Sequence, residues 1–283
     1  MNVGFVGLGV MGAPMARNVL RKGFPLRVFD IDVTKRQGLS ADGAVAVAGI
    51  ADLAAWADAI ILMLPGPQEI RAVALQVAES ARRGAAIVDM STSDPALDQE
   101  MSAALGERGV GWLDAPVTRA VPAAIAGTLM AMVGGDAQVL EKCRPVLAAM
   151  ASDIVHVGPS GSGHAMKLLN NLKIMAEVAL MAEVVALGAR GGIPAGVVNE
   201  VLGQSSADSF MWRYQVPRMV AENFTPGFSV DNGHKDLSLA AGWARRLGAS
   251  LPMGDAALAV FEAGQRDGRG ALDTAVLVKL YGA

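Results

Sequence analysis

A glycine-rich turn near the start of the chain has the residue types and spacing that suit dinucleotide binding. It follows a short apolar run, opens a segment of helical composition, and reads Gly7-Leu8-Gly9-Val10-Met11-Gly12. In such a turn the first glycine permits the tight bend, the second lets the backbone approach a pyrophosphate, and the third lets helix and strand pack closely. The anion would sit on backbone N–H groups at the helix N-terminus. The pattern therefore predicts a nucleotide cofactor.

An acidic residue follows at the position where an adenosine ribose would be bound. Asp30 ends the second predicted strand, at the spacing after Gly12 that the dinucleotide fingerprint requires. Its carboxylate would accept hydrogen bonds from ribose hydroxyls and repel a 2′-phosphate, so we expect NAD (NADH) rather than NADP. Arg27, Lys35 and Arg36 leave NADP open, because a nearby cation accommodates the phosphate.

Lys167 and Asn171 lie one turn apart in an apolar helical segment. The i, i+4 spacing puts both side chains on one helix face, which Asn170 can join. An amine can give or take a proton, and a neighbouring amide can hold it in line. A lysine in this setting can equally snorkel, with its stem on the core and its amine in water.

Other catalytic arrangements lack the necessary spacing. His156, His164 and His234 are scattered, and Cys143 is the single cysteine of the chain, so we expect no metal site and no intrachain disulfide. No nucleophile elbow of a serine hydrolase is present.

Composition narrows the possible partners. The chain has 283 residues, with 24 basic against 27 acidic ones and a net charge of −3, which argues against nucleic acid as a partner. The most apolar helix candidate, Met175 to Ala189, contains Glu177 and Glu183, so we expect no membrane span. Met1-Asn2 runs directly into an apolar strand without the pattern of a signal peptide, and a cytoplasmic location is expected.

The first part of the chain alternates short apolar runs with helical patterns. This alternation predicts repeated βα units in an α/β, Rossmann-type, doubly wound and mostly parallel sheet whose strands are covered on both faces. The predicted strands are residues 2–6, 26–30, 59–64, 85–90, 110–114, 129–133 and 154–157.

The residue composition and its pattern change after the run from Gly158 to Gly163. Long segments of Ala, Leu, Met and Val at helical spacing follow, without convincing strands. We therefore predict a dinucleotide-binding domain over residues 1–160 and an all-α domain over 161–283 for substrate binding and oligomerisation. The second domain should begin with a long inter-domain helix from about His164 to Ala189, whose apolar flank favours a homodimer or homotetramer.

Four separated blocks resemble the β-hydroxyacid dehydrogenase family, which includes 3-hydroxyisobutyrate dehydrogenase. The blocks occur in the family's order along nearly the whole chain: VGLGVMGAPMARNVLRKG from Val6 to Gly23, DAPV from Asp114 to Val117, GHAMKLLNN from Gly163 to Asn171, and HKDL from His234 to Leu237. The resemblance implies an NAD-dependent oxidoreductase that acts on a CH–OH group and needs no metal.

The resemblance also implies roles for individual residues. Lys167 would be the general acid and base, and Asn171 would hold the amine or the substrate hydroxyl in line. Beyond the glycine turn and Asp30, the cofactor would contact Leu64, Pro65, Thr92 and Lys235. The substrate would contact Thr118, Arg119, Ala120, Asn170, Asn171 and Ile174.

One loop departs from the family pattern and bears on the substrate. Most members have Ser-Gly-Gly after DAPV, and this chain has Thr118-Arg119-Ala120. A guanidinium there favours an anionic substrate head. Sulfolactaldehyde reductases are similar in this loop and in the run Ile125 to Leu129, which favours the NADH-dependent reduction of 3-sulfolactaldehyde to 2,3-dihydroxypropane-1-sulfonate.

Several alternatives stay open at this point. Arg119 can instead point outward to an acid, or grip a carboxylate in 3-hydroxyisobutyrate, tartronate semialdehyde or succinic semialdehyde (4-hydroxybutyrate) chemistry. An alternative of another class is a dinucleotide-binding scaffold without catalysis. Lys167 and Asn171 count against that scaffold, and against imine reductases, which share the two-domain plan but carry other residues at the lysine position.

Overall fold

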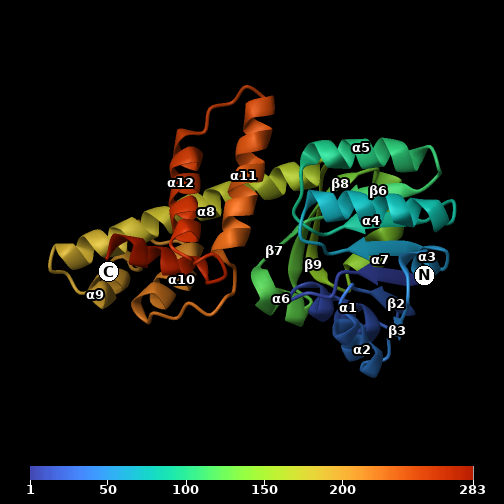
Figure 1. Cartoon of the computed structure of the whole chain (residues 1–283), viewed down its shortest axis with the longest axis horizontal. Helices are drawn as coiled ribbons and strands as arrows, with labels where there is room; N and C mark the ends of the chain where they lie inside the picture. Colours follow the sequence, from blue (N-terminus) through green and yellow to red (C-terminus); the bar gives the residue numbers. More distant parts are fainter. Residues whose placement is uncertain (283) are drawn as a thin grey trace. The chain divides into compact units, whose positions relative to one another are not determined.

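The computed structural model describes residues 1–282, and the chain divides into two compact units (Figure 1). The first unit is Met1–Lys167 and the second is Leu168–Ala283. Their boundary falls inside helix α8, Ser162–Arg190, which therefore contributes its first turns to the first unit.

The first unit is built on one nine-stranded sheet. The strand order is β3-β2-β1-β4-β5-β6-β8-β7, and β9 pairs with β8. All neighbours from β3 to β6 are parallel, whereas β8 runs antiparallel to β6 and β7. The strands are β1 Val3–Val6, β2 Leu26–Phe29, β3 Val45–Ala46, β4 Ala59–Leu62, β5 Ala86–Asp89, β6 Gly111–Asp114, β7 Val117–Thr118, β8 Leu129–Gly135 and β9 Ala151–Gly158. The predicted mostly parallel, doubly wound sheet is confirmed.

Differences from the predicted strands have local reasons. The two-residue strands β3 and β7 were not predicted, because such short segments show no periodicity. Strand β9 begins at Ala151, three residues before its prediction, because pairing with β8 extends it through the polar pair Ser152 and Asp153.

Helices cover both faces of the sheet, because alternate residues of the central strands point to opposite sides. In β4, Ile60 and Leu62 pack with α3, α4 and α5, whereas Ala59 and Ile61 pack with α1, α2, α6 and α7. The bounds of these helices are α1 Gly12–Arg21, α2 Val33–Ala41, α3 Ile50–Ala54, α4 Pro67–Ser80, α5 Pro95–Gly106, α6 Ala120–Ala126 and α7 Ala137–Leu147.

The strand order reverses at β1, which has β2 on one side and β4 on the other. In open α/β sheets ligands bind at such a switch point, outside the carboxyl ends of the strands. The glycine turn begins at the carboxyl end of β1, so the fold puts it at this switch point.

The second unit is helical. After α8 its elements are α9 Ala195–Leu202, α10 Phe210–Val220, α11 Val230–Arg246, α12 Pro252–Arg266 and the 3₁₀ helix η1 Thr274–Tyr281. The predicted helical second part is confirmed, and α8 extends slightly beyond its predicted bounds at both ends. Its core gathers one side of α8, including Val178 and Val185, against α10, α12 and η1.

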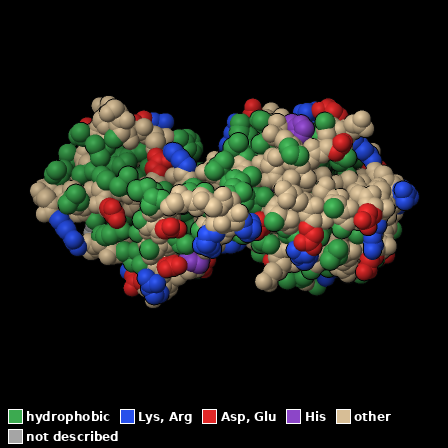
Figure 2. All heavy atoms as spheres, turned by 90° about the horizontal axis from the view of Figure 1, so that it is seen from above, with side chains coloured by type: hydrophobic (Ala, Val, Ile, Leu, Met, Phe, Trp, Pro, Cys, Tyr) green, Lys and Arg blue, Asp and Glu red, His purple; other side chains and the backbone are tan. Residues whose placement is uncertain are grey.

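Apolar side chains also reach the surface of the helical unit. Leu180 is 54%, Leu187 72% and Phe210 70% exposed, and hydrophobic side chains are visible over much of this unit in Figure 2. Exposed apolar clusters are typical of interfaces, but the homo-oligomer predicted from the sequence stays a prediction. Among residues 1–282, no helix combines the length and the apolar character that a membrane crossing requires.

Candidate functional site

The glycine turn between β1 and α1 has the close backbone approaches that its spacing predicted. Gly7 has φ +95°, and a Cβ there would lie 2.2 Å from the carbonyl oxygen of Met63. A Cβ on Gly12 would lie 2.0 Å from the carbonyl oxygen of Gly7, whereas a Cβ on Gly9 would meet nothing within 4 Å. Two glycines are therefore required by packing, and the third leaves open space where a pyrophosphate would approach.

The carboxylate of Asp30 holds this turn directly. Its Oδ2 accepts a hydrogen bond from the Leu8 N–H at 2.7 Å, and its Oδ1 accepts one from Asp32 N–H at 2.9 Å. Asp30 is 8% exposed. The side chain predicted to bind ribose thus also fixes the backbone beside the predicted pyrophosphate site, a role that the sequence did not reveal. The preference for NAD over NADP stays a prediction.

Two further strand-end loops are tied together beside this turn. Leu64 follows β4 and Ser91 follows the neighbouring β5, and the Leu64 N–H donates to Ser91 Oγ at 2.9 Å. Pro65 is exposed and Thr92 is half-buried in the same two loops. The structure thus brings the predicted cofactor residues Leu64, Pro65 and Thr92 to the carboxyl edge of the sheet.

The loop with Thr118, Arg119 and Ala120 keeps a glycine-like backbone without glycine. Arg119 has φ 87° and Ala120 φ 60°, both in the left-handed region that favours glycine. The Arg119 guanidinium donates to Asp153 at 2.7 Å and to the Thr128 carbonyl and Ser152 Oγ, each at 3.0 Å. Of the roles considered for Arg119, the pairing with an acid is therefore the one seen in this structure.

A buried cluster of carboxylates and a histidine surrounds the first turn of α8, and sequence reasoning missed it. His164 and Asp98, both 0% exposed, join through Nδ1 and Oδ2 at 2.7 Å, and His164 Nε2 lies 3.2 Å from the Ser91 carbonyl oxygen. Asp89, at the end of β5, lies with Oδ2 4.0 Å from Nε2. Asp114 and His164 lie in the DAPV and GHAMKLLNN blocks, but nothing in the sequence indicated that they come together with Asp89 and Asp98.

Asp114 caps the start of α8. Its Oδ1 accepts from the Gly161 N–H at 2.8 Å and its Oδ2 from the His164 N–H at 3.1 Å. A Cβ on Gly163 would lie 2.5 Å from the Asp114 carbonyl oxygen, so glycine is needed there for the helix to approach the strand. The start of α8 is thus bonded to the carboxyl edge of the sheet.

Burial and mutual charge shift the pKa values in this cluster. The carboxylates of Asp98, Asp89 and Asp114 outweigh burial and raise the pKa of His164 to about 9. Burial, with the charge of Asp98, raises the pKa of Asp114 to about 6. Burial also raises the pKa of Asp89. The imidazole is therefore a cation at neutral pH.

Asp89, Asp98 and His164 could also be read as a metal site, because one ligand atom of each lies within 4.8 Å of the others. Zinc bonds of about 2.1 Å in a tetrahedral site would separate two ligand atoms by about 3.4 Å. The 2.7 Å between Nδ1 and Asp98 Oδ2 is a hydrogen-bond distance instead. The geometry favours an ion pair over a shared metal.

Lys167 lies on α8 as the last residue of the first unit and is half-buried. It follows His164 by about one helical turn, so the contacts of Asp114 and His164 determine where its backbone lies within the first unit.

In the helical unit the other predicted polar residues converge on an aspartate. Asn171, 3% exposed, donates from Nδ2 to Asp236 Oδ2, and Asn170 Nδ2 donates to Asn171 Oδ1 at 2.8 Å. Lys235 Nζ lies 3.3 Å from Asp236 Oδ1. Asp236 is 1% exposed and was not among the predicted site residues. Ile174 is half-buried against the helical core.

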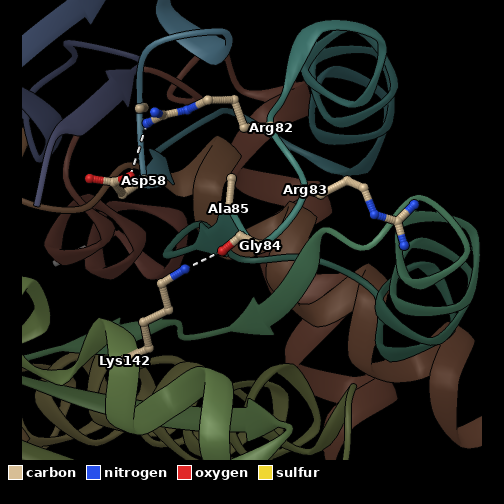
Figure 3. Close-up of a pocket in the computed structure, with 7 residues that line it drawn as sticks. Asp58, Arg82, Arg83, Gly84, Ala85 and Lys142 are labelled. Atoms are coloured by element: carbon tan, nitrogen blue, oxygen red, sulfur yellow. Dashed lines mark hydrogen bonds and ion pairs between the residues drawn. The ribbon is translucent and has the colours of Figure 1, made fainter.

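A hollow of about 190 Å³ lies at the amino ends of β4 and β5, the edge opposite the strand-end loops (Figure 3). Arg82 donates to Asp58 at 2.9 Å, Lys142 donates to the Gly84 carbonyl, and Arg83 points away from both (Figure 3). None of the predicted site residues lines it.

Comparisons with known proteins cover both units. Residues 2–158 match a family model described as the NAD-binding domain of 6-phosphogluconate dehydrogenase, and residues 161–281 match one described as NAD-binding of NADP-dependent 3-hydroxyisobutyrate dehydrogenase. The chain is 36% identical to an NAD-dependent L-serine dehydrogenase from Pseudomonas aeruginosa, with 99% of this chain and 97% of that protein covered.

Two further similarities concern a reductase and a solved structure. A 3-sulfolactaldehyde reductase from Escherichia coli is 34% identical, with 98% of this chain and 94% of the reductase covered. The structure of a 3-hydroxyisobutyrate dehydrogenase from Mycobacterium tuberculosis with L-serine has a TM-score of 0.93 at 32% identity, covering 100% of this chain and 99% of that one.

The close approach at Gly12 gives a first prediction. Gly12→Ala should weaken NADH binding at least about tenfold and lower Tm, since overpacking of this kind typically costs about 1–3 kcal/mol. Fluorescence titration with NADH and a thermal melt check this. Gly38→Ala is the matched control, because a Cβ on Gly38 in α2 meets nothing within 4 Å. Unchanged NADH affinity in Gly12→Ala would contradict the assignment of the turn.

The buried imidazolium gives a pH prediction. The pKa of His164 is raised from its ordinary 6.5 to about 9, so the stability that its charge contributes is complete below pH 6.5 and lost as pH rises through 9. Tm should therefore fall between these pH values, and His164→Gln should flatten that slope. His156→Gln is the control that should keep it. Identical slopes in wild type and His164→Gln would refute the buried cation.

Proposed function

Because the chain belongs to the β-hydroxyacid dehydrogenase family of NAD-dependent oxidoreductases that act on CH–OH groups, we propose that it interconverts a short aldehyde and its alcohol. Both compounds carry an anionic head, and Lys167 is the general acid and base. The finer proposal is the NADH-dependent reduction of 3-sulfolactaldehyde.

One observation carries the catalytic part of this proposal. The first turn of α8 is bonded to the same sheet edge that bears the cofactor loops, through the contacts of His164 with the Ser91 carbonyl and of Asp114 with the helix N–H groups. Lys167 follows on that helix. Its position on this helix supports its assignment as the residue that acts beside a dinucleotide held by those loops.

NADH, when bound, supplies the two electrons and the hydrogen that reduce the carbonyl carbon. In the proposed step the ammonium form of Lys167 gives its proton to the carbonyl oxygen, which becomes the hydroxyl. In the oxidative direction the same amine takes the hydroxyl proton. Removing a positioned acid of this kind typically costs 10²–10⁴-fold in rate.

The proposal also includes Asn171 and Lys235 of the helical unit. Asp236 accepts from the Asn171 amide and lies beside the Lys235 ammonium, which restricts the rotamers of both side chains. We assign Asn171 to positioning the substrate hydroxyl or the amine, a role in which restricted motion favours the rate.

Lys167→Ala gives the direct test of the catalytic role. Turnover should fall at least about a hundredfold because the proton donor is lost, while NADH still binds. Steady-state rates and NADH fluorescence measure the two effects. Lys173→Ala is the matched control, because Lys173 lies on the same helix with its side chain 67% exposed. Retained turnover in Lys167→Ala would remove this residue from the mechanism.

The substrate class is supported by the names of the similar proteins. Serine, sulfolactaldehyde and hydroxyisobutyrate each combine an acidic group with a hydroxyl or carbonyl a short distance away. Arg119 supports the sulfonate among them, because most members of the family leave space where its guanidinium stands.

The contact between Arg119 and Asp153 favours a second candidate, a carboxylate-bearing semialdehyde bound without Arg119. If Arg119 binds the sulfonate, it must exchange Asp153 for the substrate, since the guanidinium already donates to this acid at 2.7 Å. The two candidates therefore differ in what removal of Asp153 does.

A panel of short anionic aldehydes separates the candidates. If Arg119 binds the sulfonate, Arg119→Gly should raise KM for 3-sulfolactaldehyde about tenfold or more, because a charge-assisted hydrogen bond contributes about 1.5–3 kcal/mol. Asp153→Asn should lower the same KM, and KM for carboxylate substrates should change little in both variants. An unchanged KM for both substrate types in both variants would favour the carboxylate candidate.

A further inference from the structure

His164 has two hydrogen-bond acceptors and so uses both ring nitrogens as donors. Nδ1 lies 2.7 Å from Asp98 Oδ2, and Nε2 lies 3.2 Å from the carbonyl oxygen of Ser91. A neutral imidazole has one N–H, whereas the cation has two. With Asp98 ionised, the buried ring can satisfy both acceptors only as an imidazolium.

Asp98 is itself fixed in place. Its Oδ1 accepts from Trp112 Nε1 at 3.2 Å, and its backbone carbonyl accepts from Ser160 Oγ at 3.2 Å. Asp98 lies on α5, which packs beside the start of α8 (Figure 1). A fully buried acceptor on one helix thus meets a fully buried donor on another.

The charged groups that face His164 come from three elements. They are Asp98 on α5, Asp89 at the end of β5 and Asp114 at the end of β6. Asp89 Oδ2 is buried without a hydrogen-bond partner, 4.0 Å from Nε2. A buried charge is costly unless it is paired, so these acids keep the imidazolium stable and make its loss expensive.

The second donor of His164 leads to the cofactor loops. Ser91 accepts from His164 through its carbonyl oxygen and from the Leu64 N–H through Oγ. One continuous set of hydrogen bonds therefore links α5, the first turn of α8, the loop after β5 and the loop after β4.

We propose that His164 is a positioning residue, whose bonds to Asp98 and Ser91 hold the helix that carries Lys167 in register with the loops that carry the cofactor. This inference rests on the function proposed above. His164 touches neither substrate nor cofactor in this scheme. It acts through the Ser91 loop and through the backbone of α8.

Hydrogen exchange tests the link, meaning the hydrogen bonds of His164 with Asp98 and Ser91, without requiring turnover. In His164→Gln, backbone amides of residues 91–93 and 161–167 should exchange at least about tenfold faster, because local opening of these segments no longer has to break the ion pair. Amides of α7 should be unchanged. Val146→Ala, a truncation in the buried core of α7, is the matched control. It should speed exchange of the α7 amides and leave residues 91–93 and 161–167 unchanged.

Steady-state kinetics test whether the link positions Lys167. At a temperature where both variants are folded, kcat of His164→Gln should fall about 10- to 100-fold, as a displacement of about 1 Å can cost this much. Val146→Ala should keep its kcat. The kcat of Asp98→Asn should fall less than that of His164→Gln, because the new amide can donate to a neutral Nδ1 of His164 and leave Nε2–H to donate to Ser91.

Each result has a definite meaning. Unchanged exchange at residues 91–93 and 161–167 overturns the link, and faster exchange with an unchanged kcat overturns the positioning role. If the wild-type protein reduces none of the anionic aldehydes, the proposed function fails while the exchange measurement still decides whether the link exists.

Discussion

Helix α8 is attached to the sheet by buried polar contacts, and the arrangement of the first unit around Lys167 depends on them. Asp114 caps two N–H groups at the start of the helix, and the His164–Asp98 ion pair holds its first turn against α5. Apolar packing alone tolerates small displacements of a helix, whereas hydrogen bonds of defined length and direction do not. These contacts therefore fix the backbone position of Lys167 relative to the strand ends.

The glycine turn imposes a complementary constraint at the carboxyl end of β1. Gly7 and Gly12 allow backbone atoms to approach where a Cβ would collide, and Asp30 then holds the Leu8 N–H. Asp30 thus fixes the turn, and the same carboxylate is the one predicted to bind the ribose. The same principle operates in the helical unit, where Asp236 holds both Asn171 and Lys235.

Much of this architecture could be predicted from the sequence. The βα alternation, the switch to helices and the turn after β1 all leave periodic or compositional signals that do not depend on distant residues. The buried cluster left none, since Asp89, Asp98 and His164 are single polar residues whose meaning arises only when the fold brings them together. Arg119 illustrates the same limit: its residue type suggested an anion, and its partner in the structure, Asp153, comes from a strand whose start was not predicted.

Similar proteins are named for serine, sulfolactaldehyde and hydroxyisobutyrate, and in the proposed function Lys167 is the proton-transfer group whichever of these substrate types is bound. Chemical rescue tests that group most directly. If Lys167 delivers the proton, ethylammonium added to Lys167→Ala should restore NADH-dependent reduction in a saturable way, by about tenfold or more, with rates that depend on amine pKa. No rescue by any small amine, in a variant that still binds NADH and substrate, would contradict the account.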